Sequence, residues 1–205
     1  MIHWVGVGGY LPLHTDFSGL KIMDTIIQKI FNSNYRFELL DEWPGVADSE
    51  KRFYFPFATL MGGKDGLMIR FYPHESNNWL GVFEFGGGVT TGVYTCPNPD
   101  QVCVVSQGNS YIVNVNNPRD YIFRNLGTSG VYQVHKRQLL ILTECNGICA
   151  LGKTGIIWHN TDITDPAAFS VTDDFMKGTC EDCGKSVPFT IDMATGKLIY
   201  IGKVN

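Results

Sequence analysis

The sequence predicts a mostly β fold, an antiparallel meander of hairpins, and three observations support this prediction. Charged residues make up only 18% of the 205 residues, whereas there are 23 glycines, 13 phenylalanines and 9 tyrosines. After about residue 53, short apolar runs alternate with Gly, Pro, Asn and Asp. This pattern is typical of aromatic-rich strands joined by tight turns. Strands and helices do not alternate along the sequence, so no parallel sheet is expected.

A hairpin-like unit recurs through the last two-thirds of the chain. Its clearest copies, each an apolar strand, a short turn and an aromatic-containing return strand, span residues 111–121, 148–158 and 189–200. A looser copy runs from Leu67 to Phe83. The copies start roughly 40 residues apart, a spacing typical of β-propeller blades and similar arrays. The repeats therefore predict a propeller-like array, with a bent sandwich or a barrel as alternatives. The length barely allows four or five four-stranded units.

The strongest single hairpin signal is Asn146-Gly147, which lies between two apolar runs. Both residues of a type I′ turn need φ > 0, and Asn-Gly is the pair that adopts this conformation most readily. A two-residue turn here would pair Cys145 with Ile148 and Glu144 with Cys149. Further turns are expected at residues 152–155, where Gly-Lys-Thr-Gly occurs, and at residues 194–196, where Ala-Thr-Gly occurs.

One N-terminal helix is expected to pack on the sheet. Five apolar residues fall at helical spacing: Leu20, Met23, Ile26, Ile27 and Ile30. Asp16 or Ser18 would cap this helix, and residues 32–34 would end it. We expect a single domain over 1–205, in which 1–60 forms a helix-containing elaboration and 61–205 carries the hairpin repeats. Asp165-Pro166 further predicts one short helical turn.

Composition and charge bear on the partner classes. The 16 basic and 20 acidic residues give a net charge of −4 without a basic stripe, so nucleic-acid binding has little electrostatic support. No segment approaches the roughly 18 apolar residues of a membrane span, and residues 1–10 lack the features of a secretion signal. The expected location is the cytoplasm, without membrane association. Six cysteines would then be mostly reduced thiols.

Several stretches carry a resemblance to known proteins. Residues 154–158, Thr-Gly-Ile-Ile-Trp, and residues 192–197, Asp-Met-Ala-Thr-Gly-Lys, resemble the outer-strand turns of quinoprotein-type and other β-propeller blades. Residues 79–85, 91–97 and 187–196 are similar to a group of uncharacterised bacterial proteins. The first resemblance implies a propeller-like fold, and the second brings no activity with it.

Four cysteines form the candidate metal site. Cys145 and Cys149, together with Cys180 and Cys183, match the general layout of a structural zinc centre with four thiolates. The predicted turn argues against it, because it places Cys145 and Cys149 on opposite faces of the hairpin. The alternative is that all four are ordinary strand or turn residues. No cofactor is therefore predicted, and zinc stays an open alternative.

Two groups of residues are candidates for general acid-base catalysis. One is His74 and Glu75 in a polar turn, and the other is His159 with Asp162 and Asp165. Neither group identifies a nucleophile, and no recognised hydrolase or metalloprotease motif occurs. The glycine-rich residues 85–92 lack the ending of a phosphate-binding loop, so they are interpreted as a bend between strands.

Protein binding is the predicted function. His135-Lys136-Arg137 forms a compact cationic cluster that could contact an acidic partner, and Trp158 could line a groove or anchor the sheet. The hairpin scaffold and the lack of a recognisable catalytic set favour a non-catalytic cytoplasmic bacterial binding protein, for example an immunity- or antitoxin-like factor. A hydrolase or metal-dependent enzyme and a zinc-stapled structural module are the alternatives. The sequence leaves the oligomeric state open.

Overall fold

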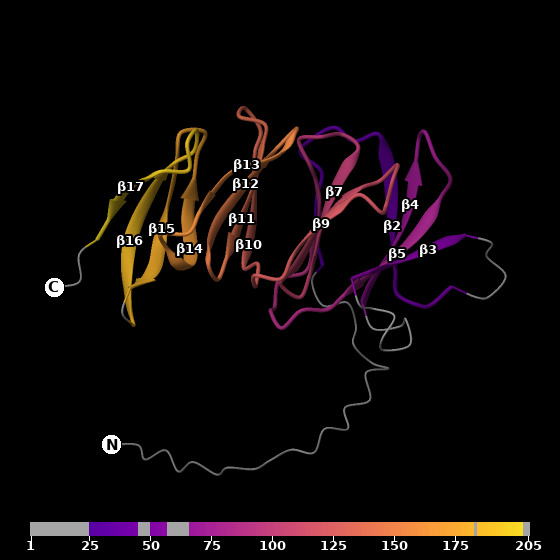
Figure 1. Ribbon diagram of the computed structural model, residues 1–205, viewed down its shortest axis with the longest axis horizontal. Coiled ribbons are helices and arrows are strands. Elements are labelled where there is room, and N and C mark those ends of the chain that lie inside the picture. Colours follow the sequence, from indigo (N-terminus) through magenta and orange to yellow (C-terminus); the bar gives the residue numbers. More distant parts are fainter. Residues whose placement is uncertain (1–24, 45–49, 57–65, 183, 203–205) are drawn as a thin grey trace, which may run out of the picture.

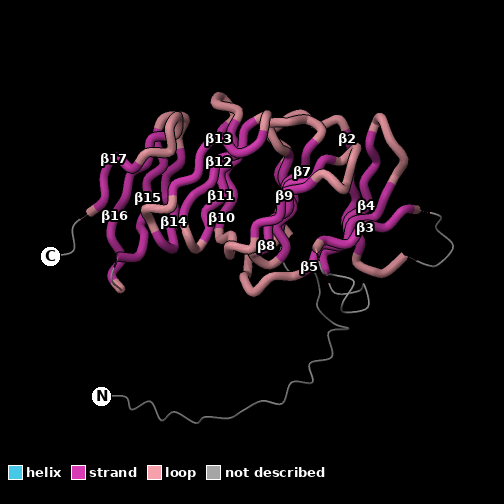
Figure 2. The backbone as a smooth tube through the Cα atoms, in the orientation of Figure 1, coloured by secondary structure: helices cyan, strands magenta, loops and turns pink. Residues whose placement is uncertain are grey.

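The protein is an array of β-sheets (Figures 1 and 2). The computed structural model describes residues 25–44, 50–56, 66–182 and 184–202, and within these ranges it has 17 strands in four sheets and no helix. In that part of the chain there is accordingly no helical segment that could cross a membrane. The mostly β prediction is confirmed. The expected boundary between residues 60 and 61 lies outside the described residues.

Sheet 1 has an order that departs from a simple meander. It runs in space β2 (Tyr35–Leu40), β4 (Gly66–Pro73), β5 (Trp79–Glu84) and β3 (Lys51–Phe55). The first two neighbouring pairs are antiparallel, but β3 lies parallel to β5 at the edge. The turn between β4 and β5 occupies the polar segment 74–78.

Sheet 2 is an antiparallel meander with one added strand. Its meander consists of β6 (Gly92–Thr95), β7 (Gln101–Ser106), β8 (Asn109–Asn114) and β9 (Tyr121–Arg124). β1 (Ile26–Gln28) joins the free edge of β6 in parallel register. In the described residues no sheet is wholly parallel, but the two parallel pairings, β1 with β6 and β3 with β5, depart from the expected antiparallel meander.

Sheets 3 and 4 are regular four-stranded meanders. Sheet 3 contains β10 (Gly130–Val134), β11 (Leu139–Glu144), β12 (Gly147–Gly152) and β13 (Gly155–Asn160). The strands of sheet 4 are β14 (Thr164–Val171), β15 (Phe175–Asp182), β16 (Lys185–Asp192) and β17 (Leu198–Ile201). The strands β15 and β16 alternate buried and exposed residues, so one face of sheet 4 packs inward and the other faces solvent.

The sheets stack in chain order, and a separate apolar core fills each gap. An aromatic core that includes Phe71, Trp79 and Phe83 joins sheet 1 to sheet 2. The second core lies between sheets 2 and 3, and the third between sheets 3 and 4. None of the three cores in the described residues joins sheet 4 to sheet 1, and Figure 1 shows these two sheets at opposite ends of the row. The stack resembles propeller blades in its face-to-face sheets, three of them four-stranded and one with β1 as a fifth strand, and in the described part it does not close into a barrel.

The recurring hairpin corresponds to the same part of three successive sheets. Residues 111–121, 148–158 and 189–200 fall on the last two strands of sheets 2, 3 and 4 and the turns that join them, with the first range ending at the start of β9. The looser copy, Leu67 to Phe83, instead forms β4 and β5, the central pair of sheet 1. The repeat is thus confirmed as a sheet-building unit, and sheet 1 departs from it because β3 takes the place of a fourth strand.

The expected N-terminal helix is wrong within the described residues. Ile26 and Ile27 are in β1, where they pair with Gly92 and Val93, and Ile30 is in a loop. Leu20 and Met23 lie outside the described residues. Backbone pairing with the open edge of β6 replaces the local hydrogen bonds of a helix. The short helical turn predicted at Asp165-Pro166 is also wrong, because both residues belong to β14.

The hairpin between β11 and β12 is confirmed, but its turn begins one residue earlier than predicted. Glu144 pairs with Gly147, so the turn residues are Cys145 and Asn146. Gly147 is required for a different reason from the expected type I′ turn. Its φ is +134°, and a Cβ atom there would lie 2.0 Å from the backbone oxygen of Asn160 at the end of β13. A close approach of the neighbouring strand therefore requires the glycine.

Candidate functional site

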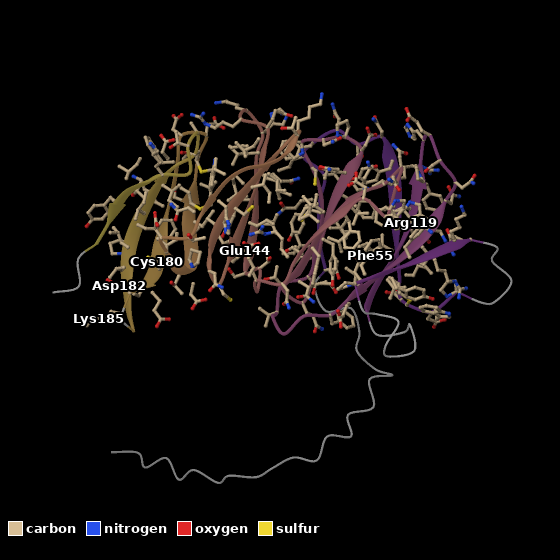
Figure 3. All side chains as sticks on the ribbon, in the orientation of Figure 1. Phe55, Arg119, Glu144, Cys180, Asp182 and Lys185 are labelled. Atoms are coloured by element: carbon tan, nitrogen blue, oxygen red, sulfur yellow. The ribbon has the colours of Figure 1, made fainter. Side chains whose placement is uncertain are left out.

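A cluster of polar side chains, built on a buried ion pair, joins sheets 2 and 3. Arg124 at the end of β9 donates from Nε and Nη2 to the two carboxylate oxygens of Glu144 at the end of β11, with 2.5 Å from Nη2 to Oε2. His159 of β13 completes the cluster, with its Nε2 atom 3.7 Å from Glu144 Oε2 and 3.4 Å from Arg124 Nη2. The Glu144 side chain is 0% exposed, and Figure 3 shows it in the interior of the array.

The electrostatics of this cluster favour a fixed ion pair. The hydrogen bonds to Glu144 raise the pKa of Arg124 above its usual value, so the guanidinium stays charged. Cys149 pairs with His159 in the register of β12 and β13. Burial raises the pKa of the Cys149 thiol to about 11, although the charge of Arg124 partly opposes this. A buried neutral thiol is a poor nucleophile near neutral pH. Because both Glu144 oxygens accept from Arg124, the carboxylate holds the two sheets together.

His159 contacts residues other than its expected partners. Its polar contacts are with Glu144 and Arg124, whereas Asp162 is exposed and its N–H donates to Asn160 Oδ1 at 2.9 Å. Asp165 has a φ of +45°, and its N–H donates to the Cys145 carbonyl at 2.8 Å. Sequence reasoning missed Glu144 and Arg124 because no motif or local spacing links them to His159.

The second candidate group, His74 and Glu75, is in the turn between β4 and β5. Both residues are exposed. The His74 N–H donates to the carbonyl of Asn34 at 3.2 Å, which fixes the turn against the start of β2. The structure thus places this group in a polar turn, as predicted. The turn belongs to sheet 1, whereas the Arg124–Glu144 pair lies between sheets 2 and 3.

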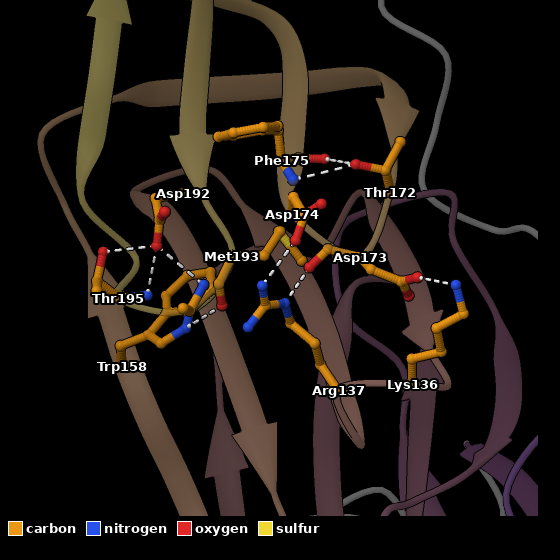
Figure 4. Close-up of polar contacts among 11 residues, drawn as sticks. Lys136, Arg137, Trp158, Thr172, Asp173, Asp174, Phe175, Asp192, Met193 and Thr195 are labelled. Carbon is orange, nitrogen blue, oxygen red and sulfur yellow. Dashed lines mark hydrogen bonds and ion pairs between the residues drawn. The ribbon is translucent and has the colours of Figure 1, made fainter.

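Two cations of the candidate partner-binding residues connect sheets 3 and 4 (Figure 4). Lys136 Nζ lies 2.8 Å from Asp173 Oδ2, and Arg137 Nη2 lies 2.8 Å from Asp174 Oδ1. Arg137 Nε also donates to the backbone carbonyl of Asp173. His135 stacks on Phe31, with ring centroids 6.2 Å apart. Both cations are therefore paired with acidic residues in the facing turn of sheet 4.

Trp158 anchors the same pair of sheets (Figure 4). Its Nε1–H donates to the carbonyl of Met193 at 3.1 Å. Gly196, with φ +70°, lies against the indole so closely that a Cβ atom there would be 2.4 Å from the ring. Nearby, Asn160 Nδ2 donates to the Gly196 carbonyl at 2.8 Å. Of the two interpretations of Trp158, these contacts support the anchor.

The candidate zinc ligands are separated by sheet 3. Cys149 is in the core between sheets 2 and 3, whereas Cys180 is in the core between sheets 3 and 4. Cys145 is exposed in its turn, and Cys183 lies outside the described residues. One ion could not bind both Cys149 and Cys180 without a rearrangement of the core. Among the residues with defined positions, no three His, Cys, Asp or Glu side chains form a possible metal site.

The cysteines should differ strongly in reactivity. Desolvation raises the pKa of all four thiols Cys96, Cys103, Cys145 and Cys149, but Cys145 is the exposed one among them. We expect iodoacetamide at pH 8 to alkylate Cys145 well before the other three thiols in the native protein, and all four in urea. Mass spectrometry of peptides after timed quenching measures the rates. Equal native rates at Cys145 and Cys149 would contradict the assigned burial.

The turn between β16 and β17 should have an acid-sensitive carboxylate (Figure 4). Thr195 Oγ1 donates to Asp192 Oδ1 at 2.8 Å, and this bond, with the N–H groups of Thr195 and Ala194, lowers the pKa of Asp192. A lowered folded-state pKa adds stability above the unfolded-state pKa, and this stability is lost as the pH falls through the folded-state pKa. Thr195→Val should therefore raise the Asp192 pKa in a carboxyl NMR titration. An unchanged midpoint would show that the hydroxyl has no such role.

Two adjacent hollows lie along the edge strand β10. The first, about 320 Å³, lies between β1, residues 89–91 and the start of β10. The second, about 440 Å³, continues along β10 to the end of β14 and the turn that follows it. Gln28, Val131 and Tyr132 line both hollows, and we call the two together the β10 groove. No sequence signal pointed to this groove, because it depends on how separate sheets pack.

Comparisons with known proteins give no assignment of function. No protein-family model matches the chain, and no curated protein is similar enough to match it. Among solved structures, the chain is similar to the N-terminal domain of Nup159, with a TM-score of 0.39 and 10% sequence identity. That match covers 88% of this chain and 54% of the other, so the chain spans about half of that solved chain. Similarity at this level assigns neither a shared fold nor a shared role.

Proposed function

We propose that the chain is a non-catalytic module that binds a protein partner through the β10 groove. The observation that carries the proposal is the groove itself, an elongated hollow along an unpaired strand edge. Its second hollow alone is about 440 Å³, within the size range of ligand sites. A shallow elongated surface of this kind suits a segment of protein chain.

The contacts of the charged candidates support the same proposal. Arg124 and Glu144 neutralise each other between sheets 2 and 3, and Lys136 and Arg137 pair with Asp173 and Asp174 between sheets 3 and 4. Each of these groups has a structural role in joining neighbouring sheets. A rigid stack of this kind presents its edges and turns in fixed positions, which lowers the entropic cost of recognition.

The finer sequence-based predictions remain predictions. They are a cytoplasmic location, a bacterial family, a propeller-type blade repeat and a role like that of an immunity or antitoxin factor. The proposal of a protein partner is compatible with each of these predictions and depends on none of them.

The test measures binding and turnover on the same preparations. We expect a pull-down from extract of the source organism to recover a saturable partner. Gln28→Lys in the groove should weaken this binding, whereas His159→Ala, beside the Arg124–Glu144 pair, should retain it. The same proteins are assayed on panels of esters and phosphoesters. Turnover by the wild type that disappears in His159→Ala would overturn the proposal in favour of a hydrolase. Failure to find any saturable partner would also contradict it.

A further inference from the structure

The open edge of β10 is the main feature of the groove. β10 pairs with β11 on one side, and no strand in the described residues pairs with its other side. In an antiparallel pair, alternate residues of an edge strand direct their N–H and C=O groups away from the partner strand. These groups need hydrogen bonds from water or from another chain. The edge is thus available to an added strand.

Sheet 2 contains a precedent for such an addition. Its first meander strand, β6, has the same place in its sheet that β10 has in sheet 3. The extended segment β1 covers the β6 edge, with Ile26, Ile27 and Gln28 opposite Gly92, Val93 and Tyr94. Gln28, the last residue of β1, also lines both hollows of the β10 groove. The groove is therefore continuous with an edge that an extended segment already occupies.

A buried acceptor without a partner lies beside the β10 edge. Gln133 Nε2 donates to the carbonyl of Thr95 at 2.8 Å, which fixes the amide against sheet 2. The Gln133 Oε1 atom is buried and has no hydrogen-bond partner. An unpaired buried acceptor costs stability, so such groups usually have a partner in the functional state. Gln133 also lines the second hollow, so its side chain lies at the groove although the Oε1 atom itself is enclosed.

The lining of the groove indicates the chemistry of the occupant. Among the described lining residues, Asp173 is the single carboxylate, and Lys136 already pairs with it at 2.8 Å. Val131, Val134 and Val171 supply apolar surface, and Tyr132 adds an aromatic ring. Beside them, Ile26 and Ile27 of β1 are 45% and 49% exposed. Uncharged polar side chains, among them Gln28, Gln133 and Thr172, complete the lining. An uncharged segment that presents both apolar and polar side chains therefore fits this surface better than a charged one.

We infer that the β10 groove binds an extended, uncharged segment of a protein partner by β-strand addition to β10. The inference rests on the proposed function and specifies its mode of recognition. β10 spans five residues, so the paired segment is about five residues long. Main-chain hydrogen bonds to β10 supply affinity, and alternate side chains contact Val131 and Tyr132.

The first step of the test selects peptides from a displayed library of random dodecamers on the full chain. The best uncharged sequences are then synthesised with a single N-methyl group at each position in turn. We expect N-methylation to abolish binding at alternate positions of one stretch of about five residues, because a strand pairs through every second N–H. Hydrogen exchange should show new protection in β10. Protection of another edge, such as β17, would overturn the inference.

Matched variants separate the groove from the other edges. Gln28→Lys introduces a charge at the groove from β1, and Tyr132→Lys does so from β10. Tyr200→Lys, at a 55% exposed residue of β17, is the control. We expect the first two to weaken peptide binding about tenfold or more and the control to leave it unchanged. Circular dichroism shows whether each variant folds. If Tyr132→Lys does not fold, Gln28→Lys alone tests the groove.

The outcomes distinguish this inference from the proposed function. If a natural partner binds while Gln28→Lys and Tyr132→Lys retain full affinity, the groove is not the binding surface, and both the inference and the proposed function are wrong. If the groove variants weaken binding but N-methylation shows no alternation and β10 gains no protection, only the strand-addition mode is wrong and the proposed function stands. If neither a natural partner nor any selected peptide binds, both fail. Peptide binding with alternating N-methyl sensitivity, β10 protection and loss in the groove variants supports the strand-addition mode.

Discussion

Replacing Glu144 by alanine is expected to lower the free energy of unfolding by about 3–5 kcal/mol. The reason is the Arg124 guanidinium, whose side chain is 10% exposed and would lose the carboxylate that accepts both of its hydrogen bonds. A buried charge without a partner costs far more than an exposed pair contributes. Urea denaturation followed by tryptophan fluorescence measures the change.

Two control variants test whether the loss of stability comes from the unpaired buried charge. The double variant Glu144→Ala with Arg124→Met removes both charges and should recover most of the lost stability. Lys136→Ala breaks an ion pair that also joins neighbouring sheets, but the Lys136 side chain is 81% exposed, so its effect should be much smaller. Equal losses for Glu144→Ala and Lys136→Ala would contradict the assignment of the Arg124–Glu144 pair as the buried clamp.

Replacing Trp79 by alanine is expected to cost about 3–5 kcal/mol through lost packing. Trp79 is 2% exposed and stacks on Phe71 with ring centroids 4.3 Å apart. Its Nε1–H donates to the carbonyl of Val115 at 2.8 Å, which connects sheet 1 to the end of β8. Loss of the donor adds the cost of a buried carbonyl without a partner.

The location of the Trp79 effect follows from the linear stack. In the described residues each core joins one sheet to the next, so destabilisation should concentrate at the sheet 1 end. Hydrogen exchange should accelerate in β5 while β16 keeps its protection. Trp79→Phe is the control, since it retains a ring and loses the indole donor, at about 1–3 kcal/mol. Uniform acceleration through all four sheets would show a single cooperative unit instead.

The hairpins were predictable because their information is local. The turns at residues 152–155 and 194–196 contain Thr-Gly pairs, and the structure places both glycines, Gly155 and Gly196, at positive φ. The alternation of apolar and polar residues in β15 and β16 likewise matches their buried and exposed faces. Strands whose periodicity and turns agree can be assigned from short windows of sequence.

The N-terminal strand could not be predicted in the same way. Ile26 and Ile27 pair with residues that lie 66 positions later in the chain, Gly92 and Val93. Helical spacing of apolar residues predicts a helix only when no nearby sheet edge offers backbone partners. The same limit explains the missed parallel pairing of β3 with β5, since both depend on packing of distant segments.

The candidate site was predictable only in part, for the same physical reason. His159 was singled out because carboxylates follow it closely in sequence, yet strand geometry directs it toward Glu144 and Arg124. The cationic run was identified correctly as a surface cluster, but its pairing with Asp173 and Asp174 depends on the stacking of sheets 3 and 4. The β10 groove forms from three sheets, so no single stretch of sequence encodes it.

Site-specific photo-crosslinking tests the binding account most directly. A photoreactive phenylalanine analogue replaces Tyr132 in the β10 groove or Tyr200 on β17 in the full chain, and each protein is irradiated in extract of the source organism. The account predicts one saturable protein adduct from position 132, lost when Gln28→Lys is added, and no matching adduct from position 200. An adduct of equal yield from position 200, or an adduct from position 132 that is insensitive to Gln28→Lys, would contradict it.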